Sequence, residues 1–386
     1  MRYMVEQLVP SYQALLPGTG HLGIFPVRTR FWKYNYNDSR KNVVKPISVI
    51  RPQILPTALN GGESKGLRVF VISDLHTDYA ENMSWVRSLS HKRDDNDVLI
   101  VAGDVAETLK NFILTMSLLK ERFQHVFFVP GNHDLWLRRE NNAYANSMVK
   151  LDKLLDVCQS LGVETKPLVI DGLGIIPIFS WYHESFDTED DITDIRVPPL
   201  EMACKDYHAC KWSGELKDGH DSVAIHFDAM NEKHSDIIKE IQLRCNQILT
   251  FSHFVPRQEL CPEKRMLFYP NLPKVVGSDF LEARIRSLHG NDGRPSACHV
   301  FGHTHFCWDA LVDGIRYVQA PLAYPREQKR RMNGGEGWLP FCIFCDGEFT
   351  ARLSPCFWSD YYAVNTRTPQ NTTLAPWVAK FYRKFV

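Results

Sequence analysis

Four short polar clusters in the sequence contain the residue types that bind metal ions and move protons. Carboxylate oxygen, amide oxygen and imidazole nitrogen are the donors they offer, without thiolate, and this mixed set suits Mn, Fe or Zn. One cluster alone is as consistent with a buried polar group as with a ligand, but four in one chain predict a metal site. The clusters are Ser73-Asp74-Leu75-His76, Gly103-Asp104-Val105, Gly131-Asn132-His133-Asp134 and Gly302-His303-Thr304-His305.

Each cluster directly follows an apolar run of strand length. Because loops at the carboxyl ends of parallel strands converge on one crevice, we expect the four clusters to lie together. Strand-like and helical patterns alternate in the first half of the chain, which predicts an α/β fold with helices packed on a parallel or mixed sheet. The expected strands are 67–73, 97–102, 125–130, 247–252, 297–301, 310–319, 341–345 and 348–353, with turns at Asp313-Gly314 and Asp346-Gly347, and 169–182 is a strand or a hairpin. The expected helices are 82–91, 106–123, 143–161 and 230–246.

The spacing within the clusters supports a shared site. In Asp74-x-His76 and His303-x-His305, an alternating backbone would send both side chains of a pair to one face. The glycine that opens each of the last three clusters leaves room for a tight turn.

The ordered motifs resemble those of the calcineurin-like metallophosphoesterase superfamily: D-x-H, G-D, G-N-H-[DE], one downstream His and G-H-x-H. The resemblance implies a mixed β-sheet sandwich flanked by helices, with a metal site at the carboxyl ends of the strands. For the single downstream His we favour His253, which follows the expected strand 247–252. His183, after the apolar run that ends at Tyr182, is its rival.

The same resemblance implies two transition-metal ions and the residues that hold them. Asp74, His76 and His305 would hold one ion, Asn132, His253 and His303 the other, and Asp104 would bridge both. Two ions about 3.5–4 Å apart make hydroxide available at neutral pH, and this bridging hydroxide would attack phosphorus in line. His133 would stabilise the developing charge or protonate the leaving oxygen. Asp134 would either orient His133 or serve packing, and the sequence leaves both roles open.

The substrate class is less well determined than the metal site. The motifs imply hydrolysis of a phosphomonoester or phosphodiester, with a nuclease of the same fold or a non-catalytic binding scaffold as alternatives. Val105 and Asp134 depart from the Asp-Arg-Gly and Asn-His-Glu patterns of the protein-phosphatase branch, which weakens that assignment. Arg257, four residues after His253, is a candidate contact for a phosphate oxygen, although a surface arginine fits equally well.

A short run of basic residues lies between 326 and 331 of the expected domain. It could guide an anionic substrate or bind nucleic acid, but short basic runs are more often solvated loops. The run contains Arg326, Lys329, Arg330 and Arg331.

Composition divides the chain of 386 residues into three parts. Residues 1–66 are basic and contain Pro, and they suggest either an organellar transit segment or an extension that wraps the surface. Residues 67–353 form the expected metallophosphoesterase domain, and 354–386 are an aromatic tail suited to docking on it.

Net charge, hydropathy and cysteine content indicate the cellular compartment in which we expect the protein. The formal net charge of zero gives no overall attraction to nucleic acid or membranes, and no apolar run reaches the length of a membrane span. Ten scattered cysteines in a chain of this size favour a reducing compartment. We therefore expect a soluble intracellular protein, in a plastid or mitochondrion if 1–66 is a transit segment.

Overall fold

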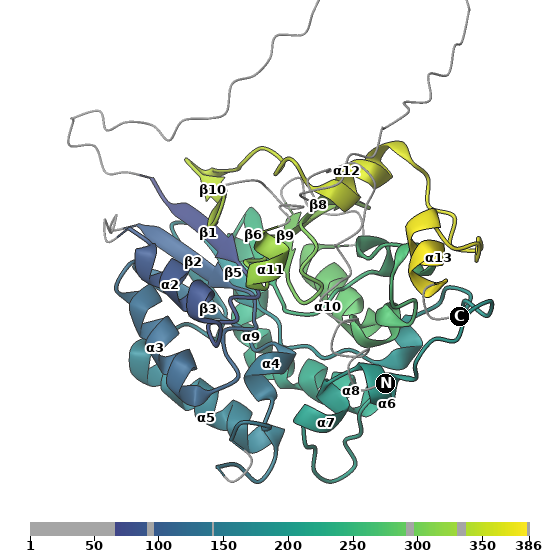
Figure 1. The fold of residues 1–386 in the computed structure, drawn as a ribbon. Coiled ribbons are helices and arrows are strands. Elements are labelled where there is room, and N and C mark those ends of the chain that lie inside the picture. Colours follow the sequence, from purple (N-terminus) through teal and green to yellow (C-terminus); the bar gives the residue numbers. More distant parts are fainter. Residues whose placement is uncertain (1–65, 91–95, 141–142, 291–296, 330–336, 384–386) are drawn as a thin grey trace, which may run out of the picture. The chain divides into compact units, whose positions relative to one another are not determined.

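The computed structural model describes residues 66–90, 96–140, 143–290, 297–329 and 337–383 (Figure 1). The expected leader falls almost wholly outside these ranges, as do Arg330 and Arg331 of the basic run. The described residues contain two mixed sheets, one of five strands and one of six.

The first sheet has the strand order β11-β10-β1-β2-β3. Its three parallel strands, β1 to β3, are joined through helices, as the alternating pattern predicts. The carboxyl ends of β1 and β2 therefore open on the same edge and carry the first two polar clusters. The strands are β1 Arg68–Ile72, β2 Asp97–Val101, β3 His125–Phe128, β10 Phe341–Cys345 and β11 Glu348–Phe349.

The second sheet has the order β4-β5-β6-β7-β9-β8. Of the strand or hairpin expected at 169–182, the structure forms a hairpin that turns at Asp171 and Gly172. The run at 310–319 is also a hairpin, with the expected turn at Asp313 and Gly314. The strands are β4 Leu168–Ile170, β5 Leu173–Pro177, β6 Gln247–Phe251, β7 Ala297–Phe301, β8 Trp308–Val312 and β9 Ile315–Gln319.

Apolar side chains between the two sheets form one continuous core. Val69 and Ile100 of the first sheet pack in the same cluster as Leu249 and Val300 of the second, and all four are fully buried. The outer faces of the sheets are covered by helices, which accounts for the near-continuous apolar sequence of the central strands. The expected sandwich is therefore the observed fold.

Helices α2, α3 and α5 lie together on the outer side of β1 to β3 (Figure 1). Helix α5 ends at Gly162 in the left-handed conformation, as its sequence predicts. The helix expected at 230–246 is α9, which begins only at Ser235 because a 3-10 turn occupies 231–234, and α8, which ends at Met230, was not expected. The longer helices are α2 Ala80–Ser88, α3 Leu109–Lys120, α5 Ser147–Leu161, α8 Asp221–Met230, α9 Ser235–Arg244, α10 Asp279–His289, α12 Phe357–Val364 and α13 Pro376–Tyr382.

Short helices, which the sequence patterns did not predict, surround the polar clusters. The four-residue helices are α4 Asn132–Leu135, α6 Leu200–Ala203, α7 Asp206–Ala209 and α11 Pro325–Gln328. The 3-10 helices are Glu184–Phe186, Asn231–His234, Gln258–Leu260, Lys264–Met266 and Leu272–Val275.

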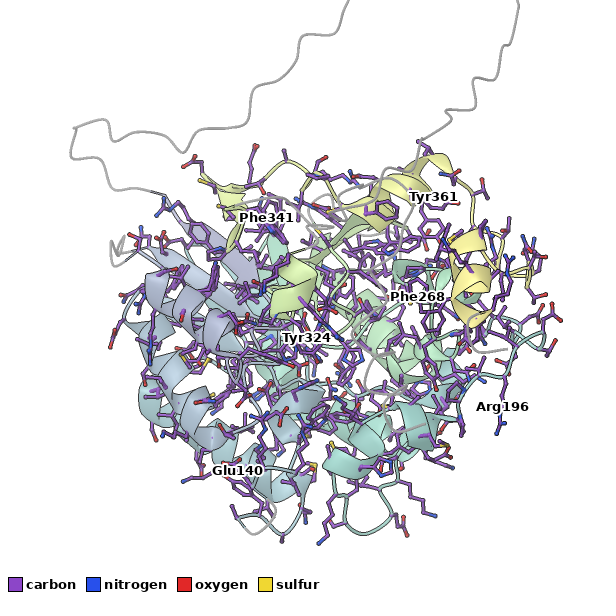
Figure 2. All side chains as sticks on the ribbon, in the orientation of Figure 1. Glu140, Arg196, Phe268, Tyr324, Phe341 and Tyr361 are labelled. Atoms are coloured by element: carbon purple, nitrogen blue, oxygen red, sulfur yellow. The ribbon has the colours of Figure 1, made fainter. Side chains whose placement is uncertain are left out.

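The aromatic tail packs against the body. Trp358 of α12 is buried, and the indole nitrogen of Trp377 in α13 donates to the carbonyl of Met266 at 3.1 Å. The hydroxyl of Tyr382 donates to the carbonyl of Phe268, which lies beside α13 (Figure 2). No helix within the described residues has the length and apolarity needed to cross a membrane.

Candidate metal centre

The predicted ligands stand in tight turns just beyond the strands. Asp74, His76 and Asp104 have φ values of 55°, 43° and 56°, and His303 and His305 have 76° and 58°. The expected alternation within each pair is therefore wrong, because left-handed turns rather than extended backbone bring the side chains together. Residues other than glycine rarely adopt this conformation, and those that do are concentrated at functional sites.

Two glycines allow the loops to approach one another closely. A Cβ atom on Gly131 would lie 2.2 Å from Oδ1 of Asp104, and one on Gly103 would lie 2.4 Å from Nδ1 of His253. Any side chain at either position would displace a predicted ligand.

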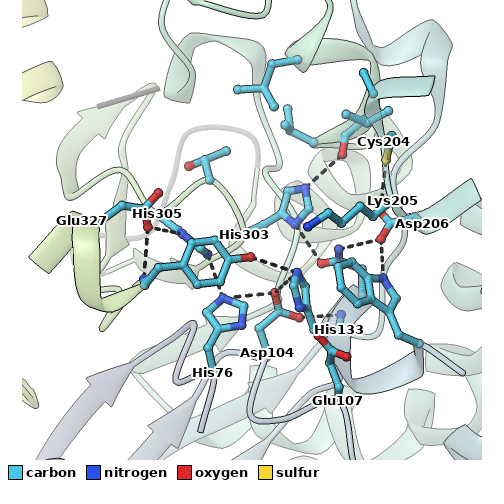
Figure 3. A pocket seen from close by; sticks show the side chains of 18 of the residues that line it. His76, Asp104, Glu107, His133, Cys204, Lys205, Asp206, His303, His305 and Glu327 are labelled. Carbon is cyan, nitrogen blue, oxygen red and sulfur yellow. Dashed lines mark hydrogen bonds and ion pairs between the residues drawn. The ribbon is translucent and has the colours of Figure 1, made fainter. Parts of the chain in front are cut away.

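A first group of donors gathers around the carboxyl ends of β1, β2 and β7. The side chains of Asp74, His76, Asp104 and His305 offer ligand atoms that all lie within 4.8 Å of one another. Nε2 of His76 is 2.9 Å from Nε2 of His305, and Nε2 of His305 is 3.4 Å from Oδ1 of Asp74. All four residues are buried, so their polar atoms face each other with little water between them. Figure 3 shows three of them, His76, Asp104 and His305, in the pocket.

A second group shares Asp104 with the first. Asp104, His253 and His303 have ligand atoms within the same 4.8 Å limit. Oδ1 of Asn132 lies 3.2 Å from Nε2 of His253 and 3.0 Å from Nδ1 of His303. The structure thus brings together all seven predicted ligands, in two groups that meet at one carboxylate, and it favours His253 over its rival.

The outward nitrogen of three of these imidazoles is held by an oxygen acceptor. Nδ1 of His305 lies 2.8 Å from a carboxylate oxygen of Glu327, and Nδ1 of His253 lies 2.8 Å from the carbonyl of Ala102. Nε2 of His303 lies 3.0 Å from the carbonyl of Val275. When the outward nitrogen donates its hydrogen, the inward one keeps a lone pair, which is how metal-binding histidines are oriented. The donor set therefore fits divalent cations.

Burial sets the protonation of the histidines. It lowers the pKa of His76 well below its usual value, lowers that of His303, and lowers that of His253 to about 3. These rings are therefore neutral at physiological pH and able to ligate a cation. His305 differs: burial lowers its pKa, but Glu327 and Asp74 outweigh this and raise the pKa above its usual value.

The shared carboxylate carries an electrostatic cost that a cation would relieve. Burial raises the pKa of Asp104 well above its usual value, and the negative charges of Asp134 and Asp74 raise it further. A bound cation reverses this balance because it favours the charged form of the carboxyl group.

Asn132 is oriented by Asp206, a residue that no sequence motif indicated. Its amide nitrogen donates to Oδ1 of the buried Asp206 at 2.8 Å, and Nε1 of Trp136 donates to the same oxygen at 2.6 Å. The amide oxygen of Asn132 therefore points at His253 and His303. Asp206 begins the four-residue helix α7, which is too short to leave a periodic pattern.

His133 lines the pocket above the donors. Its ring stacks on Trp136 with 3.6 Å between centroids, and its Nε2 lies 3.3 Å from the hydroxyl of Tyr324 and 3.9 Å from Oδ2 of Asp104. Burial and the nearby His76 lower the pKa of His133 well below its usual value, so the ring is neutral. A neutral ring favours hydrogen bonding to developing charge over protonation of a leaving group.

Asp134 holds loops in place and does not line the pocket. Its Oδ2 accepts from the backbone amides of Gly131 and Asp104, both at 2.9 Å. Its Oδ1 accepts from the amides of Val105 and Ala106 at 2.9 and 3.1 Å. Of the two roles left open by the sequence, this geometry favours the structural one.

The structure does not bring Arg257 to the pocket. Its guanidinium pairs with Glu259 at 2.8 Å, Glu282 at 3.0 Å and Asp313 at 2.8 Å, and these three carboxylates account for its position. His183 is also elsewhere, with Nε2 at 2.8 Å from Asp279.

The pocket over the donors has two unlike sides. The side next to His303 is mainly apolar, and the side next to His133 and Tyr324 is charged and aromatic. Lys205, beside Asp206, also lines it (Figure 3). The apolar lining consists of Ala203, Tyr269, Leu272, Val275 and Val276, and the charged lining of the other side includes Asp78, Glu107 and Arg138.

The sandwich and its donor cluster define a hydrolase of the metal-binding phosphoesterase class. The family profile described as calcineurin-like phosphoesterase matches residues 67–307, and the chain belongs to this family. It is a hydrolase that acts on phosphoester bonds, and members of the family use divalent metals.

Two known proteins are similar to this chain. The chain is 27% identical over 288 residues to the [acyl-carrier-protein] phosphodiesterase PptH of Mycobacterium tuberculosis, covering 70% of this chain and 83% of that one. The crystal structure of this phosphopantetheinyl hydrolase matches with a TM-score of 0.56 and 26% identity, over 70% of this chain and 94% of the other. Uncharacterized protein L509 of Acanthamoeba polyphaga mimivirus is 22% identical over 275 residues, or 67% of this chain and 91% of its own.

Proposed function

We propose that this protein is a dinuclear metal-dependent phosphodiesterase. The observation that carries the proposal is the pair of donor groups that meet at Asp104. Asp74, His76 and His305 would hold one cation, Asn132, His253 and His303 would hold the other, and Asp104 would contribute to both. Retention of all seven donors argues against a scaffold role, because a binding scaffold has no need of them.

Cations held by these residues would make hydroxide available at neutral pH and would withdraw electron density from the phosphoryl oxygens. The protein positions the substrate and the charge that develops on it. His133, fixed between Trp136 and Tyr324, donates a hydrogen bond to the leaving oxygen. Asp134 keeps the loops that carry Asp104 and His133 at a constant separation.

The substrate we propose is a phosphodiester that joins a phosphopantetheine arm to a serine of a carrier protein. The similarity to PptH, whose name describes such an activity, supports this choice. The pocket also supports this substrate. Its apolar side, beside His303, provides a surface on which the uncharged phosphopantetheine arm can lie. Lys205 lines the same pocket, where its positive charge can balance the phosphate.

The test uses purified protein reconstituted separately with Mn²⁺, Fe²⁺ or Zn²⁺. We expect release of phosphopantetheine from phosphopantetheinylated acyl carrier protein, followed by intact-mass spectrometry, and hydrolysis of bis(p-nitrophenyl) phosphate. Neither reaction should proceed after chelation. Metal-loaded protein that is inert on both diesters would refute the proposal.

A further inference from the structure

Most of the apolar side of the pocket comes from one irregular segment, residues 258–276. The segment, which the structure describes in full, consists of three 3-10 helices and the turns between them. All residues from 260 to 270 except Arg265 are buried. Buried carbonyl groups need hydrogen-bond partners, and outside a sheet or a long helix those partners come from elsewhere in the chain. The neighbours of this segment therefore decide where its side chains lie.

The C-terminal tail supplies many of those partners. Four backbone carbonyls between residues 261 and 268 accept hydrogen bonds of 2.7 to 3.1 Å from donors between residues 367 and 382. The pairs, with the donor first, are Arg367 with Cys261, Ala375 with Arg265, Trp377 with Met266, and Tyr382 with Phe268.

Side chains add to these backbone contacts. The buried carboxylate of Glu263 accepts from the hydroxyls of Tyr362 and Thr368, both at 3.1 Å. The ring of Phe268 meets that of Phe381 edge-on, with the centroids 5.2 Å apart. The tail is thus joined to the segment through its backbone and through its side chains.

The pocket wall begins directly after these contacts. Tyr269 follows Phe268 and lines the pocket, and its hydroxyl donates to the carbonyl of Pro198 at 3.0 Å. Pro198 lies just before α6, whose Ala203 lines the same side. The amide of Leu272, also in the wall, donates to the carbonyl of Tyr269 at 3.0 Å. The residues that form the wall are therefore fixed to a stretch of backbone that the tail holds.

The other end of the segment is held by the body of the domain. The carbonyl of Val276 accepts from the amide of Val255, in the loop after β6, at 2.9 Å. The preceding carbonyl, that of Val275, contacts Nε2 of His303. The end next to the metal ligands thus has its own anchor, so a change in the tail should move the apolar wall and leave the ligands in place.

We propose that the C-terminal tail determines substrate specificity, because it fixes the apolar side of the pocket in the position that receives an uncharged arm of a phosphodiester. The inference rests on the proposed function and adds to it the element that selects for the arm. Trp377 and Tyr382 are positioning residues, since they act through the backbone of Met266 and Phe268. A surface that is already ordered binds an arm without paying for its own ordering, so loosening it should raise KM and spare kcat.

The test compares two diesters that share a leaving group and differ in the arm: the p-nitrophenyl diester of phosphopantetheine and methyl p-nitrophenyl phosphate. The metal-loaded full chain is compared with Trp377→Phe, Tyr382→Phe, which keeps both rings and removes both donors. We expect KM for the phosphopantetheine diester to rise about fivefold, with kcat and metal content unchanged. For the methyl diester, kcat/KM should stay the same. Tyr382→Phe alone should give a smaller rise in the same KM.

Hydrogen–deuterium exchange provides a second readout. The amides of residues 260–272 should exchange faster in the double variant, while those of β6 and β7 keep the wild-type rate. Tyr361→Phe is the matched control, because this tail tyrosine packs on the rings of Trp358 and Tyr362, within the tail. Loss of its hydroxyl should change neither KM nor exchange.

Each other outcome contradicts the inference. Equal losses on both diesters, or faster exchange throughout the sheets, would mean that the tail stabilises the domain as a whole. An unchanged KM for the phosphopantetheine diester would mean that the tail does not select for the arm, whatever the exchange shows. A wild type that hydrolyses both diesters equally well would retain phosphodiesterase activity but would not use the apolar side for the arm. A wild type inert on both diesters would refute the proposed function itself.

Discussion

The two donor groups differ in charge although they share Asp104. The first combines Asp104 with a second carboxylate, Asp74, and two imidazoles. The second combines Asp104 with two imidazoles and the neutral amide of Asn132. Because carboxylates attract cations more strongly than amides do, we expect the first group to bind its ion more tightly.

The groups also differ in what supports them. Behind the first group stands the carboxylate of Glu327, from the four-residue helix α11. Behind the second stand the backbone carbonyls of Ala102 and Val275 and the carboxylate of Asp206. Binding at each group could therefore be weakened separately, through the residues that support its ligands.

The largest effect is expected from the residue that both groups share. Asp104→Asn should remove the second ion, weaken the first, and lower kcat by about 10³-fold. Without metal the variant should be at least as stable as the wild type, because burial and neighbouring carboxylates disfavour the charge of Asp104. Activity assays and Tm measurements with and without metal check both parts. A variant with normal activity would contradict the role of Asp104 as the ligand that the two groups share.

A smaller effect, confined to the second ion, is expected at Asp206. Asp206→Ala removes the acceptor that orients Asn132 and should weaken the second ion about 10–100-fold while leaving the first unchanged. Asp206→Asn keeps an acceptor oxygen and should recover part of the loss. Metal titration by calorimetry gives both affinities. Equal weakening of the two ions would show that Asp206 acts on the fold and not on Asn132.

The converse effect is expected at Glu327. Glu327→Gln weakens the acceptor for Nδ1 of His305, so the first ion should lose about tenfold in affinity and the second should not. The same calorimetric metal titration measures this loss of affinity. The control is Glu348→Gln, at an exposed position of the edge strand β11. A loss of affinity for the second ion alone would mean that Glu327 supports the second donor group and not the first.

The smallest effect is expected at Tyr324. Tyr324→Phe keeps the ring that packs on His76 and His305 but removes the hydroxyl 3.3 Å from His133. Loss of one such hydrogen bond costs about 1 kcal/mol, so kcat should fall roughly fivefold with both metal affinities unchanged. A change in metal affinity would place the hydroxyl's role at the first ion instead.

The sequence predicted the parts of the site that depend on strands. Asp74, Asp104 and His303 each follow a buried strand, and parallel strands bring their ends to one edge whatever the loops do. The sandwich and the meeting of the strand ends follow from that geometry, whereas left-handed turns beyond the strands bring the side chains of each pair together.

The residues that orient the ligands could not be predicted from the sequence, because they do not belong to an element with a periodic pattern. Asp206 and Glu327 stand on helices of four residues, and their partners are far away in the sequence. Arg257 shows the reverse error: closeness to His253 in the sequence suggested a substrate contact, but nearby carboxylates hold its side chain elsewhere. Closeness in the sequence predicted closeness in space only where a strand set the direction of the chain.

The most direct test of the central claim is the metal stoichiometry of the purified chain. Elemental analysis after reconstitution and stepwise chelation should give two ions per wild-type chain, lost in two separable steps. Asp104→Asn should retain one ion at most. A single ion in the wild type, or two tightly held ions in Asp104→Asn, would contradict two groups that meet at a shared carboxylate.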